Sequence, residues 1–418
     1  MGAKERVVVS GMAVASNIGT NIDTFWSNLQ KGHTNISYLE FELVNKCRTR
    51  IGGKVPTDDI ELMKSTIEPL LRNLYFKFDK YKETFYSLYC IGQIIKEGNL
   101  NASCYSDFGL IVGSGCGCMN SIEEDYVDFL LHKEINPMSI LEGMNNFITG
   151  TISIIFGIKG PSFILSSACS SAANAIGLAF KLISAGILDG CFCGGVDCCF
   201  RDIFFMGWDK LRVMTKDNDN PTKAMRPFSK NRNGFVLAEG AGYLLLVKES
   251  IAQKNKLPIY GEIIGYASTS DATHITRPNV DEQANCIAKA LNDAGIDITD
   301  VDYINAHGTS TKLNDIAETQ AIKRVFGNRA YDIPINSTKS MVGHTLGASG
   351  AIETIAAFLC MNKGIIHPTI NYDEPDEECD LFYVPNKYIE KNMEIFLKNS
   401  FGFGGSNVCL VGKKHRKE

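Results

Sequence analysis

Cys169 lies in a stretch of small residues that favours nucleophilic chemistry at a thiol. The stretch reads S-S-A-C-S-S-A-A-N-A-I-G-L-A-F over residues 166–180, between a strand-like apolar run at 163–165 and an alanine-rich helical pattern. A cysteine at a helix start meets unpaired N–H groups and the positive end of the helix dipole, which favour the reactive thiolate. Small neighbours leave room for an acyl group and let N–H groups approach a developing oxyanion: Ser167, Ala168, Ser170 and Ser171. Because the chain has 14 cysteines, a buried inert cysteine is the alternative for Cys169.

Two histidines downstream lie in turns of a similar kind. His307 belongs to N-A-H-G-T-S-T at residues 305–311 and follows a predicted apolar strand at 301–304. His344 ends a K-S-M-V-G-H turn that leads into a helical pattern. The C-terminal end of a strand is where α/β folds place chemistry. A single histidine is more commonly structural, whereas Cys169, His307 and His344 together make a set suited to nucleophilic acyl chemistry.

The elements that must position these residues occur twice along the chain. Cys169 follows a predicted strand at 162–165 and precedes a helix at 172–184 and a strand at 190–194. His344 follows a strand at 333–336 and precedes a helix at 348–361 and a strand at 397–402. The opening strand at 7–12 has a counterpart at 259–267. This order indicates two similar halves rich in βαβ units, joined near the charged segment 248–256. Such halves would place Cys169 and His344 at equivalent helix starts that face one site.

The remaining pattern predicts a helix at 22–29 capped by Asn21 or Thr20, an irregular stretch at 31–50, and largely helical structure at 61–98. A buried strand at 108–112 ends in the glycine-rich residues 113–117. This loop lacks the Gly-Lys-Ser/Thr of a P-loop and the surrounding dinucleotide pattern, so we expect no nucleotide site there.

Composition and charge exclude several classes of function. The chain has 418 residues, 44% of them hydrophobic, and a formal net charge of −5, and its one basic block is the tail at 413–417. We therefore expect no nucleic-acid partner. The longest apolar runs are interrupted and the N-terminus carries no apolar export segment, so we expect no membrane insertion and a cytoplasmic protein. The C-x-C pairs at 116–118 and 191–193 are too close for a usual zinc cluster and indicate alternation on a buried strand, so we expect no metal.

Five separated motifs together resemble one family. They are G-P-S-x-x-x-x-S-A-C-S-S-A at 160–172, R-P-F-S-K-N-R-N-G-F-V at 226–236, N-A-H-G-T-S-T at 305–311, S-T-K-S-M-V-G-H-T-L-G-A-S-G at 337–350 and N-S-F-G-F-G-G-S-N at 399–407. In order and spacing they resemble the β-ketoacyl-acyl carrier protein synthases of the KAS I/II group, from residue 8 to about residue 411. The resemblance implies a thiolase-like α/β fold of five layers, α-β-α-β-α, from two duplicated halves at 1–252 and 253–418. It also implies a homodimer.

The same resemblance assigns roles to the site residues. Cys169 would carry an acyl chain as a thioester, and its backbone N–H with that of Phe403 would form the oxyanion hole. His307 and His344 would stabilise the enolate that forms when malonyl-acyl carrier protein loses carbon dioxide. Lys339 would orient the histidine pair, with Glu353 as its counter-ion.

Further residues are implied around the entrance. Thr309 and Thr311 resemble residues that hydrogen-bond the pantetheine arm. Phe401 and Phe403 resemble gating aromatics, and the loop at 271–278, which begins with Asp271, resembles a second gate. No bound cofactor is implied, since both substrates travel on the phosphopantetheine of acyl carrier protein. Acidic carrier proteins need basic side chains for docking, and Arg212 occupies the family's position, with Lys77 or Arg72 as further candidates.

Some positions depart from the family pattern. Ser229 and Asn233 stand where the family usually has Asp, and Asp197 stands where Glu is commoner. We expect these three to alter local hydrogen bonding more than chemistry. The predicted acyl pocket also differs, and its residues are Cys116, Met138, Ser139 and Trp208. Smaller side chains leave volume and Trp208 removes some, so we hypothesise an acyl specificity different from ordinary fatty-acid elongation.

Three rival interpretations remain. A thiolase acting on coenzyme A esters would use a second cysteine near the C-terminal glycine turn, but Cys409 comes after that turn, in a predicted strand. A KAS III-type starter enzyme would replace one histidine by asparagine, yet His307 and His344 are both present. A non-catalytic, heterodimeric partner such as a chain-length factor would usually lack the cysteine.

Overall fold

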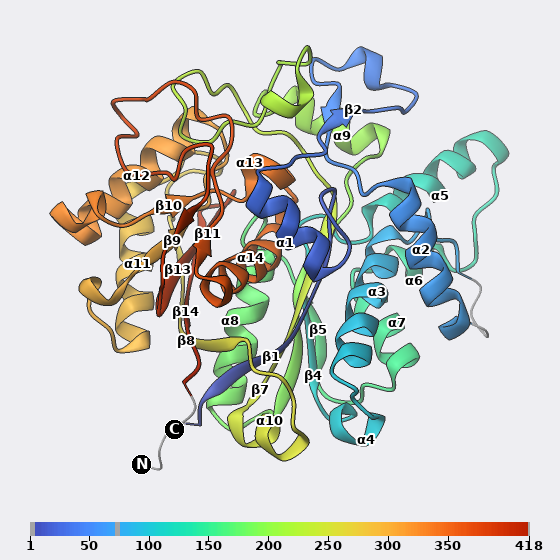
Figure 1. The fold of residues 1–418 in the computed structure, drawn as a ribbon. Helices are drawn as coiled ribbons and strands as arrows, with labels where there is room; N and C mark the ends of the chain where they lie inside the picture. The colour runs from blue at the N-terminus through green and yellow to red at the C-terminus, as the bar shows by residue number, and fades with distance from the viewer. Residues whose placement is uncertain (1–4, 72–75, 417–418) are drawn as a thin grey trace.

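A large sheet built from two matching halves organises the molecule (Figure 1). The computed structural model describes residues 5–71 and 76–416, and ten of their strands share this sheet. From the centre outward, the N-terminal half contains β1 (Val7–Ala15), β7 (Gly240–Lys248), β6 (Gly190–Asp197), β4 (Gly109–Gly113) and β5 (Ser162–Leu165). The C-terminal half contains β8 (Gly261–Ser270), β14 (Ser406–Lys413), β13 (Ile395–Gly402), β9 (Tyr303–Asn305) and β10 (Ile335–Asn336).

The two halves repeat the same pairing directions. In the first, β1 with β7 and β7 with β6 are antiparallel, whereas β6 with β4 and β4 with β5 are parallel. In the second, β8 with β14 and β14 with β13 are antiparallel, whereas β13 with β9 and β9 with β10 are parallel. The halves join where Val8 and Val9 of β1 pair with Glu262 and Gly261 of β8. This equivalence confirms the predicted duplication.

Helices fill three layers around the two half-sheets, as Figure 1 shows. The helices α8 (Ser171–Ser184) and α14 (Ser349–Lys363) pack together between them in a core of aliphatic and alanine side chains. A Cβ at Gly350 would lie 2.6 Å from the Ala173 backbone nitrogen, so glycine permits this close approach. The outer layers contain α3 (Lys82–Glu97) and α7 (Asn146–Phe156) on the first half and α11 (Val280–Ala294) and α12 (Lys312–Phe326) on the second. The predicted five-layer fold is therefore confirmed.

Shorter elements complete the chain. The helix α1 (Ile22–Lys31) begins after Asn21, whose side chain accepts from the Thr24 N–H, as predicted. The other helices are α2 (Thr57–Ile67), α4 (Ala102–Tyr105), α5 (Met119–His132), α6 (Ser139–Gly143), α9 (Asp202–Lys210), α10 (Glu249–Asn255) and α13 (Lys339–Val342). Two small ribbons pair β2 (Ser37–Tyr38) with β3 (Ile51–Gly52) and β11 (Ile365–Ile366) with β12 (Ile389–Glu390).

The predicted helical stretch at 61–98 is interrupted. It contains most of α2 and all of α3, and α2 ends where a short turn at Glu68–Leu70 begins, which contains Pro69, a residue that disfavours a continuing helix. The predicted boundary between residues 252 and 253 falls within α10, the link between β7 and β8, and stays a prediction.

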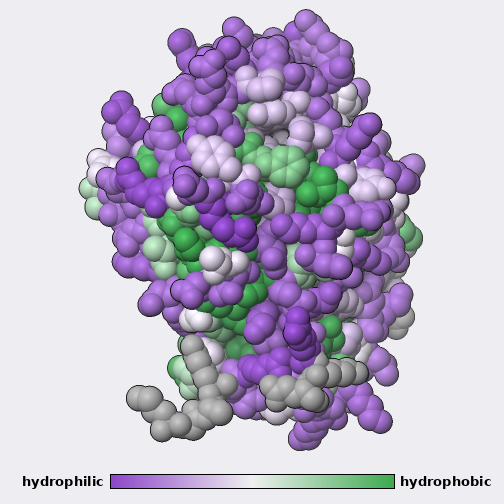
Figure 2. Space-filling view, turned by 60° about the vertical axis from the view of Figure 1, so that its left-hand side comes forward, coloured by the Kyte–Doolittle hydropathy of each residue, from purple (hydrophilic) through white to green (hydrophobic). Residues whose placement is uncertain are grey.

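The face shown in Figure 2 is mostly hydrophilic, with hydrophobic residues in patches. In the described part of the chain, no helix has the length and apolar character needed to cross a bilayer.

Candidate active site

A cavity of about 470 Å³ brings together the three residues on which the sequence interpretation rests. Cys169, His307 and His344 all line it, although they come from distant parts of the chain. Cys169 follows the end of β5, His307 follows β9, and His344 follows β10 and the short helix α13. Carboxyl ends of strands from both halves therefore meet at one site, as the duplicated pattern predicts.

The turn that carries Cys169 is tight and held from several sides. Ala168 has a φ of 52°, in the left-handed region that residues with a Cβ rarely adopt. The Ser171 hydroxyl accepts from the Ser167 N–H at 2.9 Å and donates to the Ala168 carbonyl at 2.7 Å. Since α8 begins at Ser171, the thiol lies just before the helix N-terminus, as predicted. The turn exposes the sulfur toward the cavity while fixing its backbone.

A second turn approaches the sulfur from β13. The Phe403 N–H donates to the Cys169 sulfur. A Cβ at Gly402 would lie 2.8 Å from the Ser167 carbonyl oxygen, so only glycine permits this approach. Two further glycines at 404 and 405 adopt positive φ values of 82° and 76°. This arrangement brings a backbone N–H donor to the position where an oxyanion on a Cys169 thioester would develop.

Burial changes the expected ionisation of the nucleophile. Cys169 is 6% exposed, and burial raises the pKa of its thiol to about 12, although Lys339 and the Phe403 N–H act in the opposite direction. Burial thus opposes the thiolate that the helix start is expected to favour. With a raised pKa the thiol carries its proton near neutral pH, so it must transfer that proton when it reacts.

The two histidines are neutral proton acceptors and hydrogen-bond donors. Burial and the Lys339 ammonium lower the pKa of both imidazoles well below the ordinary value. The rings lie edge to face with centroids 5.6 Å apart. His307 Nδ1 lies 3.3 Å from the Lys339 ammonium, and His344 Nδ1 accepts from the Leu346 N–H at 3.2 Å. Because Nδ1 is an acceptor in each ring, the proton of each neutral imidazole lies on Nε2.

Lys339 and Glu353 form a buried pair beneath His307. Lys339 Nζ lies 2.5 Å from Glu353 Oε1 and donates to the His307 carbonyl at 2.8 Å. Two further charged residues were missed in the sequence. Lys398 on β13 lies 2.7 Å from the other Glu353 oxygen, and Glu318 on α12 accepts from the N–H groups of His307 and Gly308. A lysine inside an apolar strand is a signal that could have identified Lys398.

The predicted pantetheine and gating residues lie around the same cavity. Thr309 and Thr311 line it, with their hydroxyls 2.8 Å apart. Phe401 packs edge to face with the His307 ring, and Phe403 stacks on Trp208 at 6.0 Å. These aromatic rings narrow the cavity close to the sulfur.

Asp271 joins the two predicted gates. Its backbone N–H donates to the Gly405 carbonyl, and its carboxylate accepts from the Asn407 side chain at 2.6 Å. The Gly404 N–H donates to the Ile275 carbonyl at 2.7 Å. The segment 271–278 and the turn after β13 are therefore hydrogen-bonded to each other, and a movement of one would require a movement of the other.

The outer part of the cavity is positively charged. Arg212 lines it as predicted, together with four other exposed cations: Arg48, Lys216, Arg277 and Lys312. Asp271 is the one carboxylate among the described lining residues, and it is buried. Lys77 is exposed but does not line the cavity, and Arg72 lies outside the described residues. We call the five cations the basic rim.

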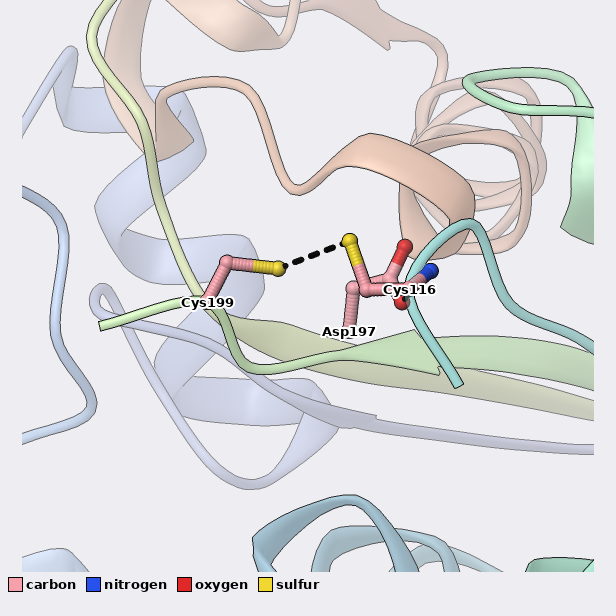
Figure 3. Close-up of side chains that lie close together, drawn as sticks. All are labelled: Cys116, Asp197 and Cys199. Carbon is pink, nitrogen blue, oxygen red and sulfur yellow. Dashed lines mark hydrogen bonds between the residues drawn. The ribbon is translucent and has the colours of Figure 1, made fainter. Parts of the chain in front are cut away.

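Three of the four predicted acyl-pocket residues do not line this cavity within the chain. Trp208 does, whereas Met138 is 46% exposed and lies with Ser139 at the start of α6. Both lie at the start of α6, next to the exposed side chains of Ile140 and Leu141, and their assignment to the acyl pocket stays a prediction. Cys116 packs against the apolar cluster that contains Cys169, and it lies in the loop after β4 and not on a strand, with its sulfur 3.1 Å from that of Cys199 (Figure 3).

The Cys116–Cys199 pair lies beside Asp197, and these three residues resemble a metal-binding cluster (Figure 3). However, each carboxylate oxygen of Asp197 already accepts two hydrogen bonds. The donors are the Ser114 hydroxyl and the N–H groups of Gly115, Cys116 and Gly347. Asp197 therefore ties the loop after β4 to the segment before α14, a structural role that needs no ion.

Comparisons with known proteins agree with this geometry. A family model described as the beta-ketoacyl synthase N-terminal domain matches residues 4–252, and the corresponding C-terminal domain matches residues 260–373. The chain is 38% identical to 3-oxoacyl-[acyl-carrier-protein] synthase 2 of Synechocystis sp. over 99% of both chains. It is 35% identical to the Coxiella burnetii protein of the same name over 98% of both chains.

Solved structures give a similar result. One match is a structure of a type II PKS acyl-carrier protein in complex with its ketosynthase bound to the hexaketide. Its TM-score is 0.89, and the identity is 30% over 99% of this chain and 100% of that one. The ishigamide ketosynthase/chain length factor provides another, with a TM-score of 0.90 and 28% identity over the same shares. Sequence and fold thus point to the same group of proteins.

Proposed function

Because this chain belongs to the beta-ketoacyl synthase family, we propose that it is a 3-oxoacyl-acyl carrier protein synthase of the KAS II type. It condenses an acyl thioester with malonyl-acyl carrier protein in fatty acid synthesis or a related pathway. The observation that supports this most is the single cavity lined by Cys169, His307 and His344, with the Phe403 N–H on the sulfur. No separate cofactor is needed, since both substrates are bound to the carrier protein.

In the first step, the Cys169 sulfur attacks the thioester carbonyl of acyl-acyl carrier protein. Its proton passes to a neutral imidazole in the same cavity and then to the departing pantetheine thiolate, which leaves as the thiol. The N–H groups of Cys169 and Phe403 stabilise the tetrahedral oxyanion. The products are acyl-Cys169 and the free thiol of the carrier protein.

In the second step, malonyl-acyl carrier protein loses carbon dioxide, and the electron pair of the broken bond forms an enolate. The Nε2–H groups of His307 and His344 donate to the enolate oxygen. The enolate carbon attacks acyl-Cys169, and the Cys169 sulfur leaves and takes up a proton. Acyl-Cys169, malonyl-acyl carrier protein and one proton thus give 3-oxoacyl-acyl carrier protein, carbon dioxide and the Cys169 thiol.

The surrounding residues position these reactants. Lys339, held by Glu353, contacts both Nδ1 and the carbonyl oxygen of His307 and so fixes that ring. Thr309 and Thr311 present hydroxyls to the pantetheine arm along the cavity wall.

Mass analysis of the carrier protein after incubation with acyl- and malonyl-loaded forms tests the function. The 3-oxoacyl product is expected, and its absence under all acyl chain lengths would refute the proposal.

The rival activities lack support at this site. Cys169 is the only cysteine among the described residues that line the cavity, and Cys409 lies on β14 with its sulfur near the Asn399 side chain. A thiolase would need a second thiol there. A non-catalytic partner would not need the neutral histidine pair and the sulfur in one cavity.

We propose that the basic rim docks the acidic carrier protein. Reversing two of its charges in the variant Arg212→Glu/Lys312→Glu is expected to raise the KM for acyl-acyl carrier protein about 10- to 100-fold. The kcat should change less than about twofold, since rim charges act before chemistry. Steady-state kinetics at low and high salt measure the KM of both proteins. Because salt screens charges, the difference in KM between the wild type and the variant should become smaller at high salt.

Two controls make the rim experiment specific. Lys254→Glu places the same change on α10, outside the cavity lining. An acyl-pantetheine thioester, which lacks the protein part of the substrate, should keep its KM in the double variant. Equal losses with the small thioester would show damage to the cavity and contradict docking at the rim.

We also propose a homodimer formed along β5. This strand is the last of its half-sheet, and within the described chain it pairs on one side only, with β4. Nearby helices expose large apolar side chains, which are costly to leave in water: Ile122, Tyr126, Leu130, Ile140, Leu141 and Ile154. A twofold axis would let β5 pair with a second copy of itself and cover these side chains.

Sedimentation measurements test this dimer. The wild type is expected at twice the chain mass, and Ile140→Asp/Ile154→Asp is expected to shift the population to the single chain at micromolar concentration. Ile298→Asp, on the opposite half, serves as the matched control. A wild type that sediments as one chain would contradict the proposal.

All 14 cysteines are free thiols, which supports a reducing compartment, and we propose the cytoplasm.

A further inference from the structure

We propose that Lys398 is a positioning residue that shares Glu353 with Lys339 and keeps both cavity histidines in their neutral, donating form. The inference rests on the proposed function, because it concerns the residues that stabilise the enolate. Lys398 has no contact with the cavity itself. It therefore acts through the charged groups beneath His307 and not on the substrate.

Lys398 is held by three partners deep within the fold. Its side chain has 0% exposure, and its ammonium lies 2.7 Å from Glu353 Oε2. It also donates to the Ser400 hydroxyl at 3.0 Å and to the Asn399 carbonyl. Glu353, on α14, is 3% exposed, and its other oxygen binds Lys339 of α13. One carboxylate thus bridges two ammonium groups from two different elements.

This arrangement fixes the position of Lys339. A buried carboxylate with a single partner can rotate, whereas each Glu353 oxygen lies against an ammonium: Oε1 accepts a hydrogen bond from Lys339, and Oε2 forms an ion pair with Lys398. Lys339 in turn contacts His307 at both Nδ1 and the carbonyl oxygen. Removing Lys398 would leave Glu353 with one cation and one unpaired buried oxygen, a costly state that the remaining groups must relieve by moving.

The same arrangement places two ammonium groups near the histidines. Two ammonium groups share one carboxylate, and burial weakens screening, so a third positive charge on an imidazole is disfavoured. Burial and Lys339 have the largest effects on the pKa of both imidazoles, and Lys398 lowers both further, after His344 in the case of His307. The other ionisable groups around His307 are Glu318, Glu353 and Cys169.

Neutral imidazoles matter for both steps. A protonated imidazole cannot accept the Cys169 proton, and it would attract the malonyl carboxylate that must leave as carbon dioxide. Loss of Lys398 should therefore allow the histidines to protonate at higher pH. The acid limb of activity would then move upward, because a nearby positive charge that opposed protonation has been removed.

Lys398→Met, which keeps the length of the side chain but removes its charge, tests this proposal. The acid limb of kcat/KM is expected to shift upward by about one pH unit, with the KM for acyl-acyl carrier protein unchanged near pH 8. Lys398→Arg, which keeps the positive charge, should show the acid limb of kcat/KM at the wild-type pH. Lys363→Met, an exposed lysine at the end of α14, is the matched control.

A direct readout separates this proposal from the proposed function. NMR titration of histidines labelled with carbon-13, assigned with His307→Asn and His344→Asn, reports their pKa values without any turnover. Upward shifts of both pKa values in Lys398→Met support the proposal, and unchanged values in the folded variant overturn it. If Lys398→Met does not fold, Lys398→Gln gives the same test. Absence of condensation by the wild type would refute the proposed function and leave this titration valid.

Discussion

Cys169→Ala is expected to abolish condensation, lowering kcat/KM by about 10⁴-fold or more. The sulfur accepts the acyl group in the first step and leaves in the last, so no other group can replace it without a new geometry. The turn around it is held by backbone contacts at Ala168 and Gly402, which an alanine side chain at position 169 does not disturb. Steady-state formation of 3-oxoacyl-acyl carrier protein measures the loss.

Cys104→Ala provides the control for Cys169→Ala. Cys104 lies on α4, away from the cavity, and its side chain is half-buried. Its replacement should leave turnover within about twofold of the wild type. Turnover by Cys169→Ala at a tenth of the wild-type rate or above would show that the acyl group is transferred without Cys169.

The histidine variants should separate the two half-reactions. His307→Ala and His344→Ala are each expected to lower the rate of extension by about 10³-fold, because each removes an Nε2–H donor to the enolate. Acylation of Cys169 should fall by less than about tenfold, since the remaining neutral imidazole can still accept the thiol proton.

Rapid mixing with acyl- and then malonyl-acyl carrier protein measures both rates. His33→Ala, at an exposed position, is the control. If acylation and extension fall together in both variants, the histidines do not divide the roles in the way proposed.

The acidity of the site has a related consequence. Both imidazoles have a lowered pKa, so they stay neutral as pH falls through the ordinary histidine range. Condensation should therefore persist below pH 6.5. The loss of Lys398 is expected to reduce this retention of activity at low pH.

The sequence predicts much of the fold because the relevant patterns are local. The strand at 162–165 has the predicted bounds, and α8 and α14 begin within one residue of their predicted starts. These elements combine clear apolar runs with glycine and small-residue turns. The duplication could be recognised because each half repeats that local order, and the structure shows the same pairing directions in both halves.

What the sequence could not predict depends on burial and on distant partners. The thiol of Cys169 appeared reactive from its helix start, but the extent of burial that raises its pKa is a property of the whole fold. Lys398 and Glu353 are separated by 45 residues in sequence number, and only the packing of β13 against α14 brings them together. Met138 and Ser139 were assigned to the acyl pocket by position in a motif, and this assignment stays a prediction, because their segment does not line the cavity of a single chain.

The basic rim shows the same limit. Arg212 could be predicted by resemblance, but Arg48, Arg277 and Lys312 come from three other segments with no shared motif. Their common position at one cavity entrance becomes visible only in three dimensions. This is also why Arg212 alone gave a weaker basis for docking than the five cations together.

Mass spectrometry of the acyl-enzyme tests the central claim most directly. The protein is incubated with acyl-acyl carrier protein, digested and analysed, and then a second portion receives malonyl-acyl carrier protein. The account predicts an acyl group on the peptide that contains Cys169, which disappears on extension as 3-oxoacyl-acyl carrier protein forms. An acyl group on a different cysteine, or one released only as free acid, would contradict it.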